Sequence, residues 1–341
     1  MDKVALRVLG GGACCALGFR LDAAECAIRA GMDRFEESEF YDRRRAPLKV
    51  ARLPLGDLWG AERLALMATA AVQDCIDQIG AIAAHETALL LLAAERERPH
   101  TEDERYLECF AAIERTLGVR FHEDSRIIPY GRAGLGQALV TAARCLEGEV
   151  RQVLLVGADS YLNAATINYF LGAGRLLESG NAYGFIPAEA AAAVLLGRDS
   201  RPGASPLQIC GVGLAEEQAR PDGEVPNRAI GLSEAMRSAL DQAGLAPGAL
   251  HFRANDHNGD PFYASEASVA YTRLMVDDGV GLPLLNLAEY LGETGAAAGP
   301  LALAYLSRVI ERDDGPGRVG LLHLGNDDGS RSAVVVAYAA D

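Results

Sequence analysis

The chain has 341 residues, half of them hydrophobic and 23% charged, with 37 Gly and 14 Pro, which is typical of a globular protein and excludes a disordered or fibrous one. Its 32 Lys and Arg against 47 Asp and Glu give a formal net charge of -15, which argues against nucleic acid and anionic membranes as main partners. No apolar run approaches the roughly 20 residues that a membrane-spanning helix needs.

Runs rich in Val, Leu and Ile alternate with longer amphipathic patterns along the chain. In chain order they predict a strand at 4–9, helices at 23–30 and 61–79, a strand at 88–93, helices at 102–117 and 134–146, strands at 151–156, 190–196 and 207–212, a helix at 233–243, a strand at 250–254, helices at 266–278 and 296–311, and strands at 319–324 and 333–338. The first strand is expected to end in a turn at Gly10, Gly11 and Gly12. This alternation is typical of a sheet buried between helices, so the fold class is α/β.

Several patterns bear on cofactors, metals and the cell compartment. Seven cysteines without Cys-x-x-Cys spacing fit reduced thiols in the cytoplasm better than a disulfide framework. The six histidines never fall at metal-ligand spacing, so no metal site is expected. The glycines at 10–12 lack the third glycine of the dinucleotide-binding pattern G-x-G-x-x-G, and no cofactor is expected. The charged run at 95–105 is predicted to be a solvated loop and helix start.

The two halves of the chain are similar to each other. Residues 71–80 and 235–244 both end in Asp-Gln-apolar-Gly, and Gly/Ala-rich helix starts at 131–136 and 292–299 each lead to an apolar strand. A linker-like cluster at 199–203 separates the halves. We expect two similar βαβ-type halves packed face to face, residues 1–199 and 206–341; chance similarity of two α/β halves is the alternative.

Four segments in chain order carry a family resemblance: the glycine-rich strand and loop at 9–18, the strand at 148–160, the Gly-Phe segment leading to an Ala-rich strand at 184–196, and the helix start at 292–299. Together they resemble the β-ketoacyl synthases, condensing enzymes of the thiolase-like superfamily. The resemblance implies a thiolase fold with a layered α/β/α/β/α core. It also implies a dimer formed edge to edge by the two central sheets.

The same resemblance implies three kinds of catalytic residue. The family's acyl-carrying cysteine lies at the start of the buried central helix, where the helix dipole stabilises a thiolate; counting back from Gly148 puts that position at Gly131. The stretch 125–137 contains no Cys. The first of the family's two histidines is similar to His257, the second position is Glu293, and the lysine position is Ala288. In the branch of the superfamily that uses Cys, His and Asn, Glu293 falls at the asparagine instead.

Each surviving candidate has a plain structural interpretation beside the catalytic one. His257 lies in a polar cluster at 255–260 that is typical of a capped turn. Glu293 precedes a helix start, where a carboxylate is stabilising. The catalytic interpretation is an acid/base pair of His257 and Glu293 that activates water on a thioester.

These residues predict a ketosynthase-like pseudoenzyme rather than a condensing enzyme. We expect a non-catalytic partner subunit, either of the chain-length-factor type, which pairs with an active ketosynthase, or an accessory protein for a bacterial type VI secretion effector. A homodimer or heterodimer is expected, and an acyl thioester or acyl carrier protein is the further partner that the resemblance implies. The alternative is a Cys-independent thioesterase, decarboxylase or acyltransferase that uses His257 and Glu293.

Overall fold

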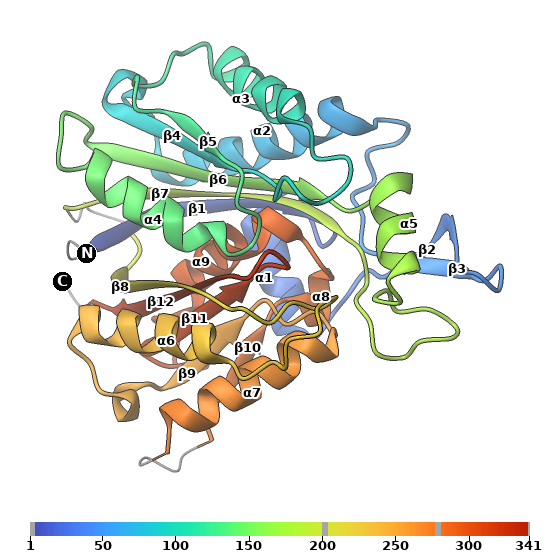
Figure 1. The fold of residues 1–341 in the computed structure, drawn as a ribbon. Coiled ribbons are helices and arrows are strands. Elements are labelled where there is room, and N and C mark those ends of the chain that lie inside the picture. The colour runs from blue at the N-terminus through green and yellow to red at the C-terminus, as the bar shows by residue number, and fades with distance from the viewer. Residues whose placement is uncertain (1–3, 200–203, 277–280, 340–341) are drawn as a thin grey trace.

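The computed structural model describes residues 4–199, 204–276 and 281–339. Its main elements lie in five layers, helix, sheet, helix, sheet and helix (Figure 1). The ten strands of these layers are hydrogen-bonded in the order β10-β9-β11-β12-β8-β1-β7-β6-β4-β5. Only Leu6 opposite Ile209 and Arg7 opposite Gln208 join β1 to β8, so this short link connects two groups of five strands. The α/β layered fold predicted from the sequence is therefore confirmed.

The first group contains β1 (Leu6–Cys15), β4 (Thr87–Leu92), β5 (Arg126–Ile128), β6 (Gln152–Ser160) and β7 (Glu189–Gly197), and the second contains β8 (Leu207–Glu216), β9 (Phe252–Asn255), β10 (Leu284–Asn286), β11 (Val319–Gly325) and β12 (Ser330–Tyr338). In both groups, parallel and antiparallel pairs are mixed. β5 and β10 are the outer strands of the sheet.

The helices cover both outer faces and fill the space between the two strand groups. α2 (Gly60–Ile79) and α3 (Asp103–Leu117) cover the first group, and α6 (Ile230–Ala243) and α7 (Pro261–Leu274) cover the second, while α4 (Gly134–Cys145) and α9 (Ala298–Val309) lie between the groups (Figure 1). Further elements are α1 (Leu21–Arg29), α8 (Ala288–Leu291) and the single turns Ala84–Glu86, Pro247–Ala249 and Gly295–Ala297.

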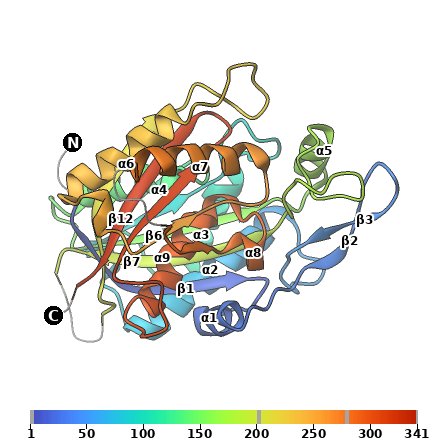
Figure 2. The ribbon, with the colours of Figure 1, turned by 90° about the horizontal axis from the view of Figure 1, so that it is seen from below.

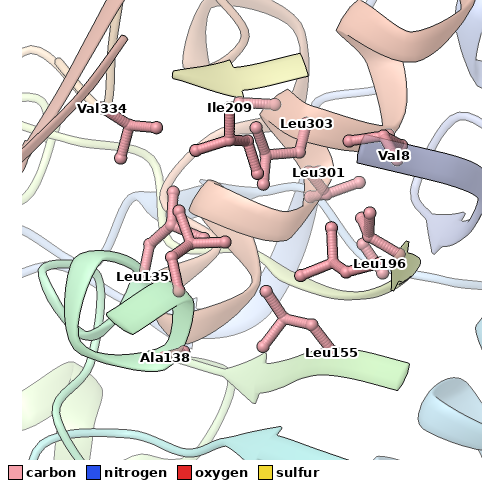
Figure 3. Packing of buried hydrophobic residues seen from close by; sticks show 14 of the residues in the cluster. Val8, Leu135, Ala138, Leu155, Leu196, Ile209, Leu301, Leu303 and Val334 are labelled. Carbon is pink, nitrogen blue, oxygen red and sulfur yellow. The ribbon is translucent and has the colours of Figure 1, made fainter. Parts of the chain in front are cut away.

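The central layer is apolar because α4 and α9 are surrounded by sheet. Side chains of both helices pack against side chains of both strand groups (Figure 3). The residues involved include Leu135 and Ala138 of α4, Leu301 and Leu303 of α9, and Val8, Leu155, Leu196, Ile209 and Val334 of the strands. A helix that is apolar around most of its circumference has to be buried on all sides. This core holds the starts of α4 and α9 in fixed positions.

The internal repeat seen in the sequence corresponds to a repeated packing contact. A Cβ atom added at Gly12 of β1 would lie 2.3 Å from the carbonyl oxygen of Ala71, and one added at Gly213 of β8 would lie 1.9 Å from that of Ala235. Ala71 and Ala235 are equivalent when 71–80 is aligned with 235–244. In each strand group, a glycine in the strand thus lets the covering helix approach closely.

Some predicted boundaries are wrong. β1 does not turn at Gly10, Gly11 and Gly12 but continues to Cys15, because these glycines serve close packing against α2 and α9 rather than a change of direction. The helix predicted at 266–278 begins at Pro261 and ends at Leu274; its last two predicted residues and most of the predicted linker at 199–203 lie outside the described residues.

A small lobe lies at one end of the layers. It consists of the hairpin of β2 (Glu36–Tyr41) and β3 (Pro47–Val50) together with α5 (Ala164–Gly172), none of which was predicted (Figures 1 and 2). Arg43 of the hairpin turn donates hydrogen bonds to the carbonyl oxygens of Leu171 and Gly172 at the end of α5. Within the described ranges, no helix has the length and apolar character that crossing a membrane requires.

Candidate functional site

The start of α4 is closed by hydrogen bonds from its own surroundings. Gly131, in the turn before α4, has a φ of 52°, and its N–H donates to the carbonyl oxygen of Ala93 at 3.0 Å. Asn326, from the β11–β12 loop, accepts from the N–H of Ala133 at 3.1 Å and donates to the carbonyl oxygen of Tyr130 at 2.6 Å. Two N–H groups at the start of the helix, which could otherwise bind an acyl oxygen, are therefore already used.

A carboxyl group lies where a side chain of residue 131 would project. A Cβ atom at Gly131 would be 2.3 Å from Oε2 of Glu95, which follows β4. Glu95 is 8% exposed, its Oε1 is 3.6 Å from Nε of Arg98, and its Oε2 has no hydrogen-bond partner among the described residues. Burial raises the pKa of Glu95 from 4.5 to about 7, with Arg98 opposing and Asp159 adding to the rise. The predicted solvated loop at 95–105 is therefore wrong for Glu95 and Arg98, which are buried.

Arg132, next to Gly131, is the buried cation of the site. Its Nη1 donates to Oε2 of Glu293 at 2.8 Å, its Nε lies 3.6 Å from Oδ2 of Asp256, and its guanidinium lies over the ring of Tyr263. Burial by itself would lower the pKa of Arg132, but Glu293 and Asp256 outweigh it and hold the pKa well above its ordinary value. The residue therefore stays charged in the interior.

Glu293 lies at the start of the turn that leads into α9. Its Oε1 accepts the N–H of Gly295 at 2.8 Å, and its Oε2 accepts from Arg132 and from the side-chain amide of Asn258. Burial raises the pKa of Glu293 and Arg132 opposes the rise. The helix-start interpretation of Glu293 thus matches its observed contacts, since its carboxylate receives a backbone N–H there.

Asp159, at the end of β6, is a second carboxylate at the start of α9. Its Oδ2 accepts the N–H of Ala296 at 2.9 Å, and its Oδ1 accepts from Nη2 of Arg98 at 2.5 Å. Asp159 and Arg98 are both almost completely buried. The two helix starts are therefore connected through the contacts of Glu95, Arg98 and Asp159.

His257 lies in a different environment from Glu293. Its N–H donates to Oδ1 of Asn255 at 3.3 Å, as expected for a polar turn, and its ring lines a cavity of about 10 Å³ together with His323 and Glu266. Burial lowers the pKa of His323 from 6.5 to about 4. Within the described part of the chain, no hydrogen bond or ion pair joins His257 to Glu293; the neighbouring Asp256 is the residue of this turn that contacts Arg132.

The remaining positions considered in the sequence analysis add no catalytic side chain to the site. Ala288, at the family's lysine position, is the first residue of α8 and donates its N–H to Asn286. The cysteine in α4 itself, Cys145, lies at the far end of the helix from Gly131 and so does not supply the missing nucleophile. Among the described residues, no group of three or more His, Cys, Asp or Glu side chains is arranged to hold a metal ion.

Sequence reasoning missed the side chains that dominate this site, which are Glu95, Arg98, Arg132, Asp159, Asp256 and Asn326. One signal was available: Arg132 directly follows the position assigned to the nucleophile, and a charged residue at the start of an otherwise apolar helix needs a buried partner. The partners themselves come from loops that are distant in the sequence.

Comparisons with known proteins bear on the fold. No protein-family model and no curated protein matches the chain. A solved complex described as the type II PKS acyl-carrier protein with its ketosynthase, AntDE:AntF, contains a chain with a TM-score of 0.83 at 15% identity, covering 99% of this chain and 100% of that one. The chain has a ketosynthase-like, thiolase-type fold.

Two further structures show the same ketosynthase-like fold. The ketosynthase ApeO in complex with its chain length factor ApeC, from Xenorhabdus doucetiae, gives a TM-score of 0.74 at 15% identity and 98% coverage of both chains. The ishigamide ketosynthase/chain length factor gives 0.73 at 17% identity, covering 98% of this chain and 100% of that one. Identity at this level shows the fold and leaves function to the site itself.

Proposed function

We propose that this chain is a ketosynthase-like partner subunit that does not catalyse Cys-dependent condensation. The observation that carries the proposal is that the start of α4 has no nucleophilic side chain and is filled by neighbouring groups. Residue 131 is a glycine, the carboxyl group of Glu95 lies where its side chain would project, and its N–H is bound to Ala93. A thioester would meet no nucleophilic side chain at residue 131, and the N–H groups of Gly131 and Ala133 are already bound.

The buried ion pair makes the site hard to open. Arg132 and Glu293 are 5% and 3% exposed and 2.8 Å apart. Separating such a pair without replacing either partner costs about 3–5 kcal/mol, because each charge would remain in a poorly solvating interior. A substrate would have to compensate both charges in order to enter, and an uncharged acyl thioester offers neither.

Two kinds of protein partner fit this proposal. A chain-length-factor-like role, with an active ketosynthase as the partner in a heterodimer, is supported by neighbours whose structures are described as ketosynthase and chain length factor together. A role beside a type VI secretion effector is the other kind. The same proposal includes association with a second copy, an acyl thioester or an acyl carrier protein. It also includes residence in the cytoplasm. We further propose that the chain divides into two halves, residues 1–199 and 206–341.

The outer strand β5 is the place where we propose that the partner binds. It is the last strand of the first group, so its outer backbone groups have no neighbouring strand in the described chain. Tyr130, two residues beyond β5, is 51% exposed. An aromatic side chain beside an open strand edge is well suited to a protein interface.

Co-purification with a candidate ketosynthase encoded beside this gene tests the partner role. The tagged chain is expected to retain that ketosynthase through size-exclusion chromatography, and Tyr130→Asp to weaken retention by about tenfold or more, a loss of at least about 1.4 kcal/mol. Tyr183→Asp is the matched control, because Tyr183 is 74% exposed and lies far from β5 in the sequence. Equal retention of both variants would overturn the assignment of β5, and failure to retain any neighbouring ketosynthase would contradict the chain-length-factor role.

The enzymatic alternative needs His257 and Glu293 to act together on a thioester. It predicts release of free thiol that is lost in both His257→Ala and Glu293→Ala. Glu293 already accepts hydrogen bonds from Arg132, Asn258 and Gly295, and His257 faces the cavity shared with His323. These contacts support the partner role over the acid/base pair.

A further inference from the structure

A cavity of about 350 Å³ is lined by residues of β2 and by residues at the starts of α2, α3 and α5. An adjoining depression of about 520 Å³ shares Phe40, Trp59 and Leu162 with it. Small-molecule sites commonly have volumes of about 300–1,000 Å³. Gly131, Glu95, Arg132 and Glu293 do not line this cavity. Asp159 does line it, so the cavity adjoins the candidate site but does not include the start of α4.

The interior of the cavity offers mainly apolar surface. Phe40, Trp59, Leu64, Tyr106 and Leu162 line it. Leu64, Tyr106 and Leu162 are buried within the fold, whereas Trp59 is 52% exposed at the mouth. A large aromatic side chain that is half exposed beside an apolar cavity leaves a surface that a ligand can cover.

The polar groups deep in the cavity are already satisfied. Arg63 donates to Glu189 and to the carbonyl oxygen of Leu53, and Asp159 accepts from Arg98. The hydroxyl of Thr101 donates to backbone carbonyl oxygens. Because these groups are already paired and the wall is mainly apolar, the cavity favours a ligand body that is itself apolar.

The rim of the cavity carries two nitrogen-rich side chains. His100 and Arg105 contact each other, and both pair with the carboxylate of Glu102, at 3.3 Å from Nδ1 of His100 and 3.0 Å from Nε of Arg105. Glu102 is 53% exposed, so this pairing is weak and a ligand can replace it. His100 also has a φ of 69°, a left-handed conformation that few residues other than glycine adopt.

We propose that this cavity binds a carboxylic acid with an apolar body. The apolar part fills the space under Trp59 and Phe40, and the carboxylate takes the place of Glu102 beside Arg105 and His100. An Arg fork and an imidazole together match the geometry and charge of a carboxylate. This binding activity does not depend on the proposed partner role, and its test uses no thioester.

Trp59 is the only tryptophan in the sequence, so its fluorescence reports this cavity directly. Octanoate is the probe, and octanol is the uncharged control with the same apolar chain. We expect a saturable change of Trp59 emission with octanoate at a Kd below about 1 mM, and about tenfold weaker binding of octanol. Arg105→Gln should remove this preference, whereas Arg115→Gln, at the other end of α3, should keep it.

A second pair of variants tests the location. Ala164 lines the cavity and is the first residue of α5, so Ala164→Phe should fill the cavity and abolish binding. Ala165→Phe is its control, since Ala165 is exposed and does not line the cavity. Thermal unfolding by circular dichroism checks that both variants fold.

Four results would overturn the proposal. These are no change of Trp59 emission with octanoate, equal binding of octanol, unchanged octanoate binding by Ala164→Phe, and a Trp59 emission that varies with protein concentration alone and does not respond to octanoate. The last result would show that a second copy of the chain covers this surface.

Discussion

The helices α4 and α9 both lie in the layer between the two strand groups, yet their starts are stabilised in different ways. At α4, the neutral amide of Asn326 receives the backbone N–H, and the nearby carboxyl group of Glu95 makes no hydrogen bond to the helix through its Oε2. At the turn into α9, the carboxylates of Glu293 and Asp159 both receive backbone N–H groups. Each of these carboxylates is paired with a buried arginine.

The neutral amide at the start of α4 and the carboxylates at the start of α9 show how charge is distributed in the closed site. Arg132 comes from the start of α4 but pairs with Glu293 at the start of α9, so one ion pair joins the two helix starts. Glu95 is the carboxyl group without a close ion pair, and its pKa is raised by burial. Burial raises the pKa of both Glu95 and Glu293. Arg132 opposes the rise at Glu293 from 2.8 Å, whereas Arg98 lies 3.6 Å from Glu95.

The largest effect is expected from removing the cation between the two helix starts. Arg132→Met should lower the free energy of unfolding by about 3–5 kcal/mol, because it leaves Glu293 and Asp256 buried without their partner. Urea unfolding followed by circular dichroism measures this change.

A double variant distinguishes loss of charge balance from loss of packing. Arg132→Met with Glu293→Gln should regain part of the lost stability, since it removes an uncompensated carboxylate. A loss below about 1 kcal/mol in the single variant, as seen for exposed ion pairs, would show that the pair is solvated and the site open.

A pH-dependent effect of intermediate size is expected from Glu95. Its pKa is raised in the folded state, so the folded protein keeps a proton that the unfolded chain loses near pH 4.5. The stabilisation from this proton is fully present below pH 4.5 and is lost as the pH rises through about 7. Glu95→Gln should therefore be more stable than the wild type above pH 7, by up to about 3 kcal/mol.

Unfolding free energies measured from pH 4 to pH 8 test this sign. The difference between wild type and Glu95→Gln should grow with pH across the window, whereas the difference for the exposed Glu97→Gln should stay constant. A difference for Glu95→Gln that stays flat would mean that Glu95 is ionised and solvated throughout.

The smallest effect is expected at the neutral cap of α4. Asn326→Ala removes the acceptor for the N–H of Ala133 and should cost about 1 kcal/mol in unfolding free energy. Asn326→Asp keeps the acceptor but cannot donate to the carbonyl oxygen of Tyr130, so its cost should be similar or larger. If both variants unfold like the wild type in urea, the cap contributes nothing to holding the site closed.

Most of the fold could be predicted because its strands and helices have clear periodicity. The eight strands and seven helices expected from the sequence all have counterparts with shifted ends. The missed elements are short or carry little apolar pattern: β5 and β10 have three residues each, and β2 is mostly exposed and rich in Glu. The glycines at 10–12 were misread because close packing and turning favour the same residue.

The site was less predictable because its parts meet only in three dimensions. The family resemblance located Gly131 and Glu293, which lie at the starts of α4 and α9, but it gave no information on what fills the space left by a missing side chain. Glu95 and Arg98 belong to a charged run that looks like solvated surface, and Asn326 lies near the C-terminus. Their burial follows from the packing of the loops, which no local pattern encodes.

Thiol release is the measurement that tests the closed site most directly. The purified chain is incubated with acyl-CoA and malonyl thioesters, and free thiol is followed for the wild type, His257→Ala and Glu293→Ala. If the site is closed, none of the three proteins should release thiol above the uncatalysed rate. Release by the wild type that disappears in both variants would contradict it and would make this chain a Cys-independent enzyme.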